Sequence, residues 1–132
     1  MAQLLTDLPA GHRFDRLTIA LDPTRAAAYR EAAGDKLDVY EREAVVPPLA
    51  VPALCLGALL ETVSLPPGTL HASERVEFRK PVPAGASVDC DTVLSQRSQR
   101  SGWIVSVIDS QVMLSGEVAV QARATLLSPI SQ

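Results

Sequence analysis

The sequence of 132 residues is poor in aromatic residues, in cysteine and in net charge. Only 4% of the residues are Phe, Trp or Tyr, so the core must be built from Ala, Val and Leu. A formal net charge of −3 provides none of the positive potential that attracts nucleic acid or an anionic membrane. The two cysteines, Cys55 and Cys90, form neither a disulfide framework nor a metal cluster. We therefore expect a cytoplasmic protein with no cofactor, no metal, no nucleic-acid partner and no membrane partner.

Long hydrophobic runs are also scarce. The uncharged stretch over residues 44–60 approaches the length of a membrane span, but three prolines interrupt its first half. About residues 52–63 remain as a helix, which is too short to cross a bilayer. Because this helix is apolar all round, we expect protein to surround it on most sides, with a second chain to cover the rest. The N-terminus has no basic region and reaches Asp7 before any apolar stretch, so no signal peptide is predicted.

What the sequence does contain is alternating hydrophobicity in its second half. Alternation predicts strands at residues 14–21, 70–79, 88–94, 103–113 and 117–127. The pairs Ser101-Gly102 and Ser115-Gly116 mark hairpin turns. Asp22 is the expected cap of a short helix that Gly34 ends, and a charged, irregular stretch follows that helix.

Strand alternation also assigns the faces of residues 70–79. Leu70, Ala72, Val76 and Phe78 are expected on one face, and His71 with Ser73 and Arg75 on the other.

The element order predicts a single α+β domain over residues 1–132, with residues 1–12 loosely ordered. A flat sheet covers a nearly charge-free helix on one side only, so we expect the antiparallel sheet to wrap around the long helix. Sheet edges and leftover apolar surface in so small a domain favour a symmetric dimer.

Two stretches resemble the MaoC-like dehydratase family of hotdog proteins. Residues 46–54 read Val-Pro-Pro-Leu-Ala-Val-Pro-Ala-Leu, and residues 65–85 contain Leu-His before a strand and Phe-Arg-Lys-Pro-Val followed by Ala-Gly. The likeness covers about residues 14–128. The sequence is most similar to the N-terminal, substrate-holding half of the (R)-specific enoyl hydratases that contain two hotdog domains. It is also similar to separate subunits of (3R)-hydroxyacyl thioester dehydratases.

The resemblance implies a hotdog fold, an acyl-CoA or acyl-carrier-protein thioester as ligand, and a homodimer or a heterodimer with a second hotdog chain. Active members of the family carry Gly-Asp-x-Asn-Pro-Ile-His-x-Asp after the short helix. In the family, the Asp and His of this motif share the removal of the proton alpha to the thioester and the elimination of hydroxide from the β-carbon. Residues 34–41 here read Gly-Asp-Lys-Leu-Asp-Val-Tyr-Glu. The resemblance therefore places Asp35 at the catalytic Asp and Tyr40 at the His.

Tyr40 is a poor replacement for a catalytic histidine. An imidazole titrates at about pH 6.5, whereas a tyrosine has a pKa of about 10 and is mainly a hydrogen-bond donor at neutral pH. His71 is the best other candidate for a general base, although a strand histidine more often has a structural or interface role. Asp35 is equally compatible with a solvated loop.

The start of the long helix is the predicted binding element for the thioester carbonyl. Ala53 and Leu54 are the expected N–H donors, because Pro52 has no N–H and helix N-termini carry unpaired donors. Ala53, Gly57 and Ala58 leave room beside the helix for an acyl or pantetheine chain.

Arg97 and Arg100 lie at an expected hairpin end, where arginines either bind the phosphates of the thioester carrier or only solubilise a turn.

Three functions remain open at this point. The first is a (3R)-hydroxyacyl dehydratase or enoyl hydratase, or its non-catalytic substrate-holding subunit. The second is an acyl-CoA thioesterase in which Asp35 or Glu61 positions water. The third is a non-enzymatic acyl-ligand-binding or scaffold domain, because fold alone does not choose among activities.

Overall fold

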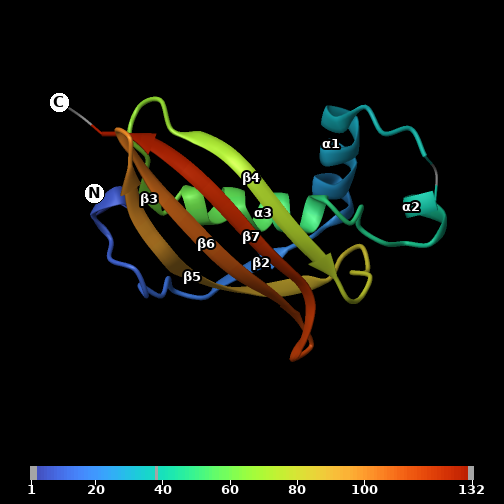
Figure 1. Ribbon diagram of the computed structural model, residues 1–132. Helices are drawn as coiled ribbons and strands as arrows, with labels where there is room; N and C mark the ends of the chain where they lie inside the picture. The colour runs from blue at the N-terminus through green and yellow to red at the C-terminus, as the bar shows by residue number, and fades with distance from the viewer. Residues whose placement is uncertain (1–2, 38, 131–132) are drawn as a thin grey trace.

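The computed structural model describes residues 3–37 and 39–130. The elements in chain order are β1 (Gln3–Leu4), the 3-10 helix η1 (Leu5–Asp7), β2 (Leu17–Ala20), α1 (Pro23–Ala33), α2 (Val39–Arg42), α3 (Ala50–Leu60), β3 (Val63–Ser64), β4 (Leu70–Phe78), β5 (Ser87–Arg100), β6 (Trp103–Leu114) and β7 (Glu117–Pro129). A five-stranded antiparallel sheet has the order β2-β5-β6-β7-β4, and β1 pairs separately with β3. The helix α3 lies along one face of the large sheet (Figure 1).

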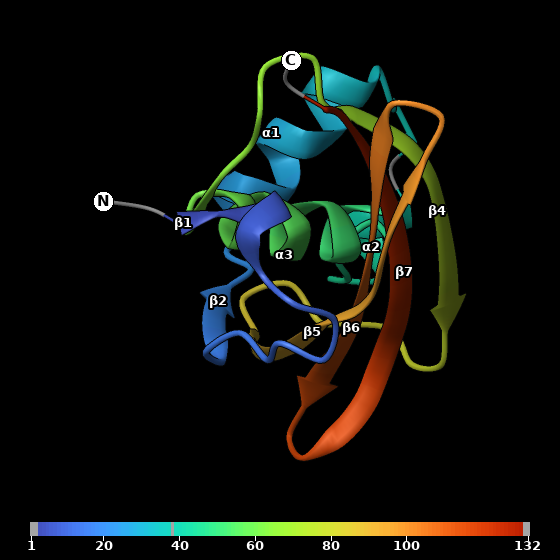
Figure 2. The ribbon, with the colours of Figure 1, turned by 60° about the vertical axis from the view of Figure 1, so that its left-hand side comes forward.

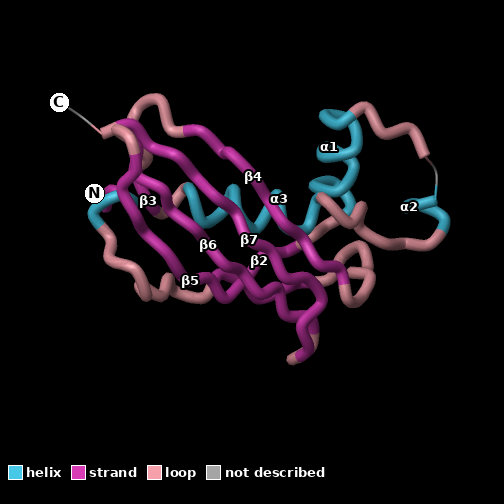
Figure 3. Tube along the Cα trace, in the orientation of Figure 1, coloured by secondary structure: helices cyan, strands magenta, loops and turns pink. Residues whose placement is uncertain are grey.

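The predicted helices and hairpins form for the local reasons that the sequence indicates. The Asp22 carboxylate accepts a hydrogen bond from the Arg25 backbone N–H at 2.8 Å, and Gly34 ends α1 with a φ of 71°. Ser101-Gly102 and Ser115-Gly116 have positive φ at both residues, as tight two-residue hairpins require. The short helix and both hairpin predictions are therefore confirmed. The stretch after α1, which was expected to be irregular, contains the short helix α2, and its other described residues before α2 run as loop (Figure 3).

The sheet wraps partly around α3, as predicted for a hotdog fold. Figure 2 shows it passing from β2 on one side of the helix to β4 on the other. An i, i+4 stripe of α3 packs inside this curve, with Val51, Cys55 and Leu59 at most 4% exposed. None of the helices in the described part of the chain is long and apolar enough to span a membrane.

Within the single chain, protein covers α3 on the side of the sheet and leaves another side exposed. Leu49, at the N-terminal cap of the helix, is 58% exposed, and Ala53 and Gly57 on the same side are exposed as well. The physical reason is geometric, because one curved sheet covers one side of a helix and Ala53 and Gly57 face away from it.

The N-terminal segment also differs from its expected loose order. Residues 1 and 2 lie outside the described residues, but Leu5 is 0% and Leu8 is 3% exposed. Both leucines pack against Leu59 and Leu94 at the C-terminal end of α3. Backbone hydrogen bonds fix the following residues along β5, including Gly11 N–H to the Leu94 carbonyl at 2.7 Å. Two isolated leucines carry no periodic signal, so the sequence pattern did not reveal this contact.

We predict that Leu5→Ala destabilises the protein by about 2–4 kcal/mol, because it opens a cavity under a fully buried side chain. The matched control is Leu4→Ala, which truncates the neighbouring leucine at 39% exposure and should cost less than about 0.5 kcal/mol. Urea unfolding curves measure both changes. Equal, small losses for the two variants would show that the N-terminal segment is not packed.

Candidate functional site

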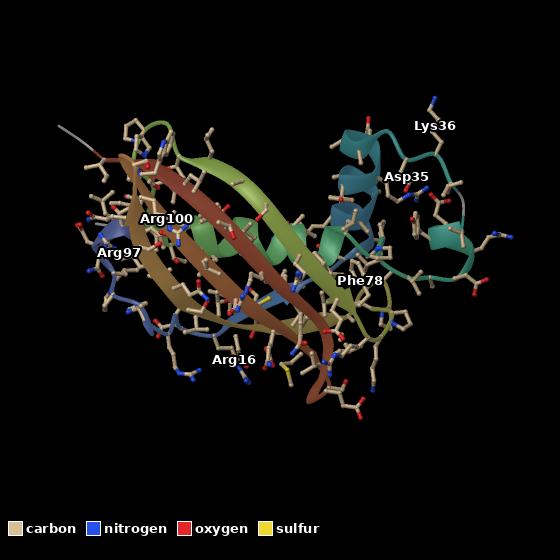
Figure 4. The ribbon with its side chains drawn as sticks, viewed as in Figure 1. Arg16, Asp35, Lys36, Phe78, Arg97 and Arg100 are labelled. Atoms are coloured by element: carbon tan, nitrogen blue, oxygen red, sulfur yellow. The ribbon has the colours of Figure 1, made fainter. Side chains whose placement is uncertain are left out.

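The most apolar hollow of the chain is a groove of about 380 Å³ between α2, the start of α3 and the end of β4. We call it the apolar groove. Its walls are largely aliphatic, and they include Val45, Val46, Val51, Phe78, Val82 and Val120. Val51 and Val120 are each 1% exposed and form its deepest part, whereas Phe78 is 45% exposed. Figure 4 places Phe78 where β4 ends, near the start of α3. The groove therefore offers a hydrophobic surface that water still reaches.

Two basic side chains accompany this apolar surface. Arg79 and Lys80 line the groove, and their side chains are about half exposed. Arg79 donates to the Gln121 amide oxygen at 3.0 Å, and Lys80 forms an ion pair with Glu117. The groove thus combines hydrophobic walls with two cationic side chains, each beside a carboxylate, Glu77 for Arg79 and Glu117 for Lys80. This combination suits an amphiphile whose anionic head competes with those carboxylates.

Tyr40 lines the apolar groove, but Asp35 does not. The Asp35 carboxylate accepts a hydrogen bond from the Leu37 backbone N–H at 3.0 Å, as in an Asx turn. Asp35 lines a different hollow with Gly34 and Lys36, on the loop after α1 (Figure 4). The two residues at the family's catalytic positions therefore share no hollow.

The predicted face of His71 is wrong because β4 contains a bulge. The register with β7 shifts between His71 and Ser73, which places His71 opposite Leu126 and Glu74 opposite Ala124. Leu126 and Ala124 face the core, so His71 and Glu74 share the side of the sheet that carries α3. The His71 Nε2 lies 3.7 Å from Glu74 Oε2.

The same bulge separates the apolar residues of β4 that were expected on one face. Val76 lies opposite Ala122 and Phe78 opposite Val120, whereas Leu70 lies opposite Leu127 on the outer face. A bulge inserts one residue without any clear mark in the hydrophobic pattern, so alternation counted through it fails.

The predicted binding residues of α3 lie outside the apolar groove. The Ala53 N–H donates to the Leu49 carbonyl at 3.3 Å and so belongs to the helix itself. Leu54 and Ala58 pack partly against the core. Gly57 faces open space, since a methyl group there would meet no other part of the protein within 4 Å. Room beside Gly57 exists as expected, but it lies on the exposed side of the helix.

Arg97 and Arg100 lie on β5, in the half of the molecule opposite Phe78 (Figure 4). The Arg97 Nε–H donates to the Thr6 carbonyl at 2.9 Å and ties the N-terminal segment to the sheet. Arg100 is exposed. The structure does not bring these two arginines to the apolar groove.

Sequence reasoning missed the cations that do line the groove. Arg79 and Lys80 lie within the Phe-Arg-Lys-Pro stretch, which served only to support the family resemblance. The signal that could have identified them is their place directly after Phe78. An apolar side chain followed by two cations forms an amphiphilic segment, which is suited to line a groove.

Cys55 and Cys90 are both buried, as predicted for core thiols. A hydrogen bond with Cys55, together with burial, raises the pKa of the Cys90 thiol. Because only the thiolate is strongly nucleophilic, Cys90 is inert. No group of three His, Cys, Asp or Glu side chains able to hold a metal occurs in residues 3–37 and 39–130.

Comparison with known proteins identifies the fold. No family model and no curated protein sequence matches this chain. Solved structures do match, among them the (R)-hydratase from A. caviae involved in PHA biosynthesis. Its TM-score is 0.76 at 17% identity, and the match covers 92% of this chain and 98% of that one.

A MaoC-like dehydratase from Rhodospirillum rubrum matches with a TM-score of 0.71 at 17% identity, over 99% of both chains. The 3R-hydroxyacyl-ACP dehydratase complex HadBC from Mycobacterium tuberculosis matches with a TM-score of 0.74 at 19% identity, over 90% of this chain and 96% of that one. Another MaoC-like dehydratase is matched over only 44% of its length. These likenesses confirm the hotdog fold of MaoC-like dehydratases and (R)-hydratases.

Proposed function

We propose that this chain is a MaoC-like hotdog protein that binds acyl-CoA or acyl-carrier-protein thioesters, as the substrate-holding subunit of a hydratase or dehydratase. The observation that carries the proposal is the apolar groove, which has Tyr40 in its wall in place of a catalytic histidine. The hotdog fold shared with an (R)-hydratase and a 3R-hydroxyacyl-ACP dehydratase supports the same substrate class.

The groove suits the two ends of such a thioester. Burying each methylene of an acyl chain against aliphatic walls is worth about 0.8 kcal/mol. Arg79 and Lys80 are placed to pair with the phosphates of coenzyme A or of a phosphopantetheine arm. Tyr40 also lines the groove, and a tyrosine hydroxyl is able to donate a hydrogen bond to a carbonyl or hydroxyl oxygen of a ligand.

The geometry favours holding a substrate over transforming it. Hydration of an enoyl thioester needs a base and an acid within hydrogen-bond reach of the same substrate. Asp35 lies in a different hollow from Tyr40, and His71 is not among the residues that line the groove. A second hotdog chain that carries the Asp and His would complete the site. HadBC and the ChsH1–ChsH2 complex are solved assemblies of two named chains on this fold.

The surface for such a chain is the edge of β4. This strand pairs with β7 on one side only, and eight of its nine residues are exposed. Leu70 is 53% exposed at its start. An edge strand with exposed apolar side chains is a template for pairing with another sheet. The uncovered side of α3 provides further apolar surface for the same partner.

Binding of a fluorescent or radiolabelled crotonyl-CoA tests the site. We expect Val45→Phe, which adds bulk to the groove wall, to weaken binding by about tenfold, equivalent to about 1.4 kcal/mol. Gly57→Val is the matched control, because it adds bulk to the open side of α3. The reverse result, in which only Gly57→Val loses binding, would show that the acyl chain lies beside the exposed side of α3. It would refute the groove as the binding site.

A second measurement tests the role of holding subunit. We expect the purified chain alone to bind crotonyl-CoA without hydrating it, because no complete acid–base pair lines the groove among residues 3–37 and 39–130. Absorbance of the enoyl thioester follows hydration, and a thiol reagent follows hydrolysis. Hydration by the chain alone would contradict the holding role, and its survival in Asp35→Asn would exclude Asp35 from the mechanism. Release of free thiol would instead identify a thioesterase.

The β4 edge predicts self-association of the purified chain at micromolar concentration. We expect Leu70→Lys to weaken the dimer by about tenfold or more, since it places a charge on the pairing strand. Leu37→Lys alters an equally exposed leucine on a loop and should leave the dimer intact. Sedimentation velocity measures both. A monomeric wild-type chain would mean that a copy of itself is not the partner.

A further inference from the structure

The wall of the apolar groove on the α1 side is a single segment of chain. We call residues 39–45, which comprise α2 and the three residues after it, the Tyr40 strap. Tyr40 and Val45 line the apolar groove and also a second hollow of about 390 Å³ against α1. The strap is therefore a single segment that separates the two hollows. The shape of the apolar groove depends on the position of this segment.

The C-terminal end of the strap is held by backbone hydrogen bonds. The Ala84 N–H donates to the Ala44 carbonyl at 2.8 Å, and the Val46 N–H just beyond the strap donates to the Val82 carbonyl at 2.8 Å. A β-bridge joins Val45 to Pro83. For its N-terminal part, α2, the described residues show no backbone hydrogen bond to another element, and none of the four residues of α2 is buried. An isolated turn of helix is unstable in water, so side-chain contacts must hold it in place.

Arg30 of α1 supplies those contacts. Its guanidinium donates to Glu41 Oε1 at 2.8 Å and to the Leu37 carbonyl at 2.6 Å, just before the strap. The guanidinium carbon lies 5.6 Å from the centre of the Tyr40 ring, within the range of a cation–π contact. The side chain is only 13% exposed. Charge-assisted hydrogen bonds from a planar guanidinium hold their partners in a defined orientation.

One feature of Arg30 argues against a role in stability alone. Its Nε–H is buried and has no hydrogen-bond partner. A desolvated donor without a partner lowers the stability of the fold. The guanidinium nevertheless contacts residues 37, 40 and 41. We attribute its position to these three contacts.

We propose that Arg30 is the positioning residue of the apolar groove: it holds α2 against α1 and thereby fixes Tyr40 in the groove wall. The assignment of a ligand to that groove rests on the proposed function, whereas the hold on the strap does not. Sequence reasoning placed Arg30 in an alanine-rich helix and gave it no role. An arginine four residues before the helix-ending Gly34 carries no signal for a contact with a later segment.

Hydrogen exchange of the strap amides tests the hold directly, without any ligand. The reporters are the N–H groups of Glu43 and Val45, which donate to the Val39 and Tyr40 carbonyls. We expect Arg30→Ala to speed their exchange by about tenfold or more, because the contacts that oppose local opening are lost. The Val46 N–H, bonded to Val82, should keep its protection and serves as the internal reference.

Two further variants make the exchange result specific. Arg30→Lys keeps the charge but loses the planar fork, and should give an intermediate acceleration with an unchanged melting temperature. Arg25→Ala removes an exposed arginine of the same helix and should change nothing. If Arg30→Ala does not fold, Arg30→Lys alone decides the matter. Unchanged exchange at Glu43 and Val45 in the variant that folds overturns the proposal.

Binding of crotonyl-CoA then connects the strap to the groove. With the wild-type chain binding this probe, we expect Arg30→Ala to weaken binding by about tenfold while Arg25→Ala binds as the wild type does. Faster exchange with unchanged binding would overturn the positioning role in the groove. A wild-type chain that does not bind the probe refutes the proposed function, and the exchange data still decide whether Arg30 holds the strap.

Discussion

The structure depends on one packing problem: α3 is apolar on every side, and one curved sheet covers only part of it. The sheet curves so that strands from β2 to β4 reach around the stripe that contains Val51, Cys55 and Leu59. The N-terminal segment closes one end of that helix with Leu5 and Leu8. The side that carries Ala53 and Gly57 remains exposed, as do eight of the nine residues of the β4 edge strand.

The other end of α3 is closed differently, and this difference locates the apolar groove. At the C-terminal end, Leu5 and Leu8 of the chain's own N-terminal segment pack against Leu59 in one buried cluster. At the N-terminal end, the Tyr40 strap lies over Val51 and Val120 without filling the space between them, and a groove of about 380 Å³ remains. The strap also has weak local structure, since α2 buries none of its side chains. A wall of this kind takes its position from Arg30, a residue of another helix.

Patterns local to the sequence predicted most of the fold. Asp22, Gly34 and the two Ser-Gly pairs each determine the backbone within a few residues, so the short helix and the hairpins appeared where expected. The errors concern contacts distant in sequence. Leu5 and Leu8 find their partners more than fifty residues away, and the bulge after His71 is fixed by pairing with β7. For the candidate site, the catalytic role that the resemblance gives to Asp35 and Tyr40 stays a prediction, and the alternative loop interpretation of Asp35 agrees with its local hydrogen bond to the Leu37 N–H.

Binding of a thioester and its chemical conversion place different demands on atomic distances, so the two functions can be divided between two chains. Burial of an acyl chain needs only an apolar wall of suitable shape, and its free energy grows gradually with each methylene in contact. Proton transfer needs donor and acceptor atoms at about 2.6–3.2 Å from the reacting group, so a shift of 1 Å removes most of its effect. In this chain the apolar wall is present, whereas Asp35 is bonded to Leu37 and faces another hollow. Under the proposed function, a partner at the β4 edge would need to supply only the two reacting side chains, because the groove for the acyl chain is already formed by Val51, Phe78 and the strap.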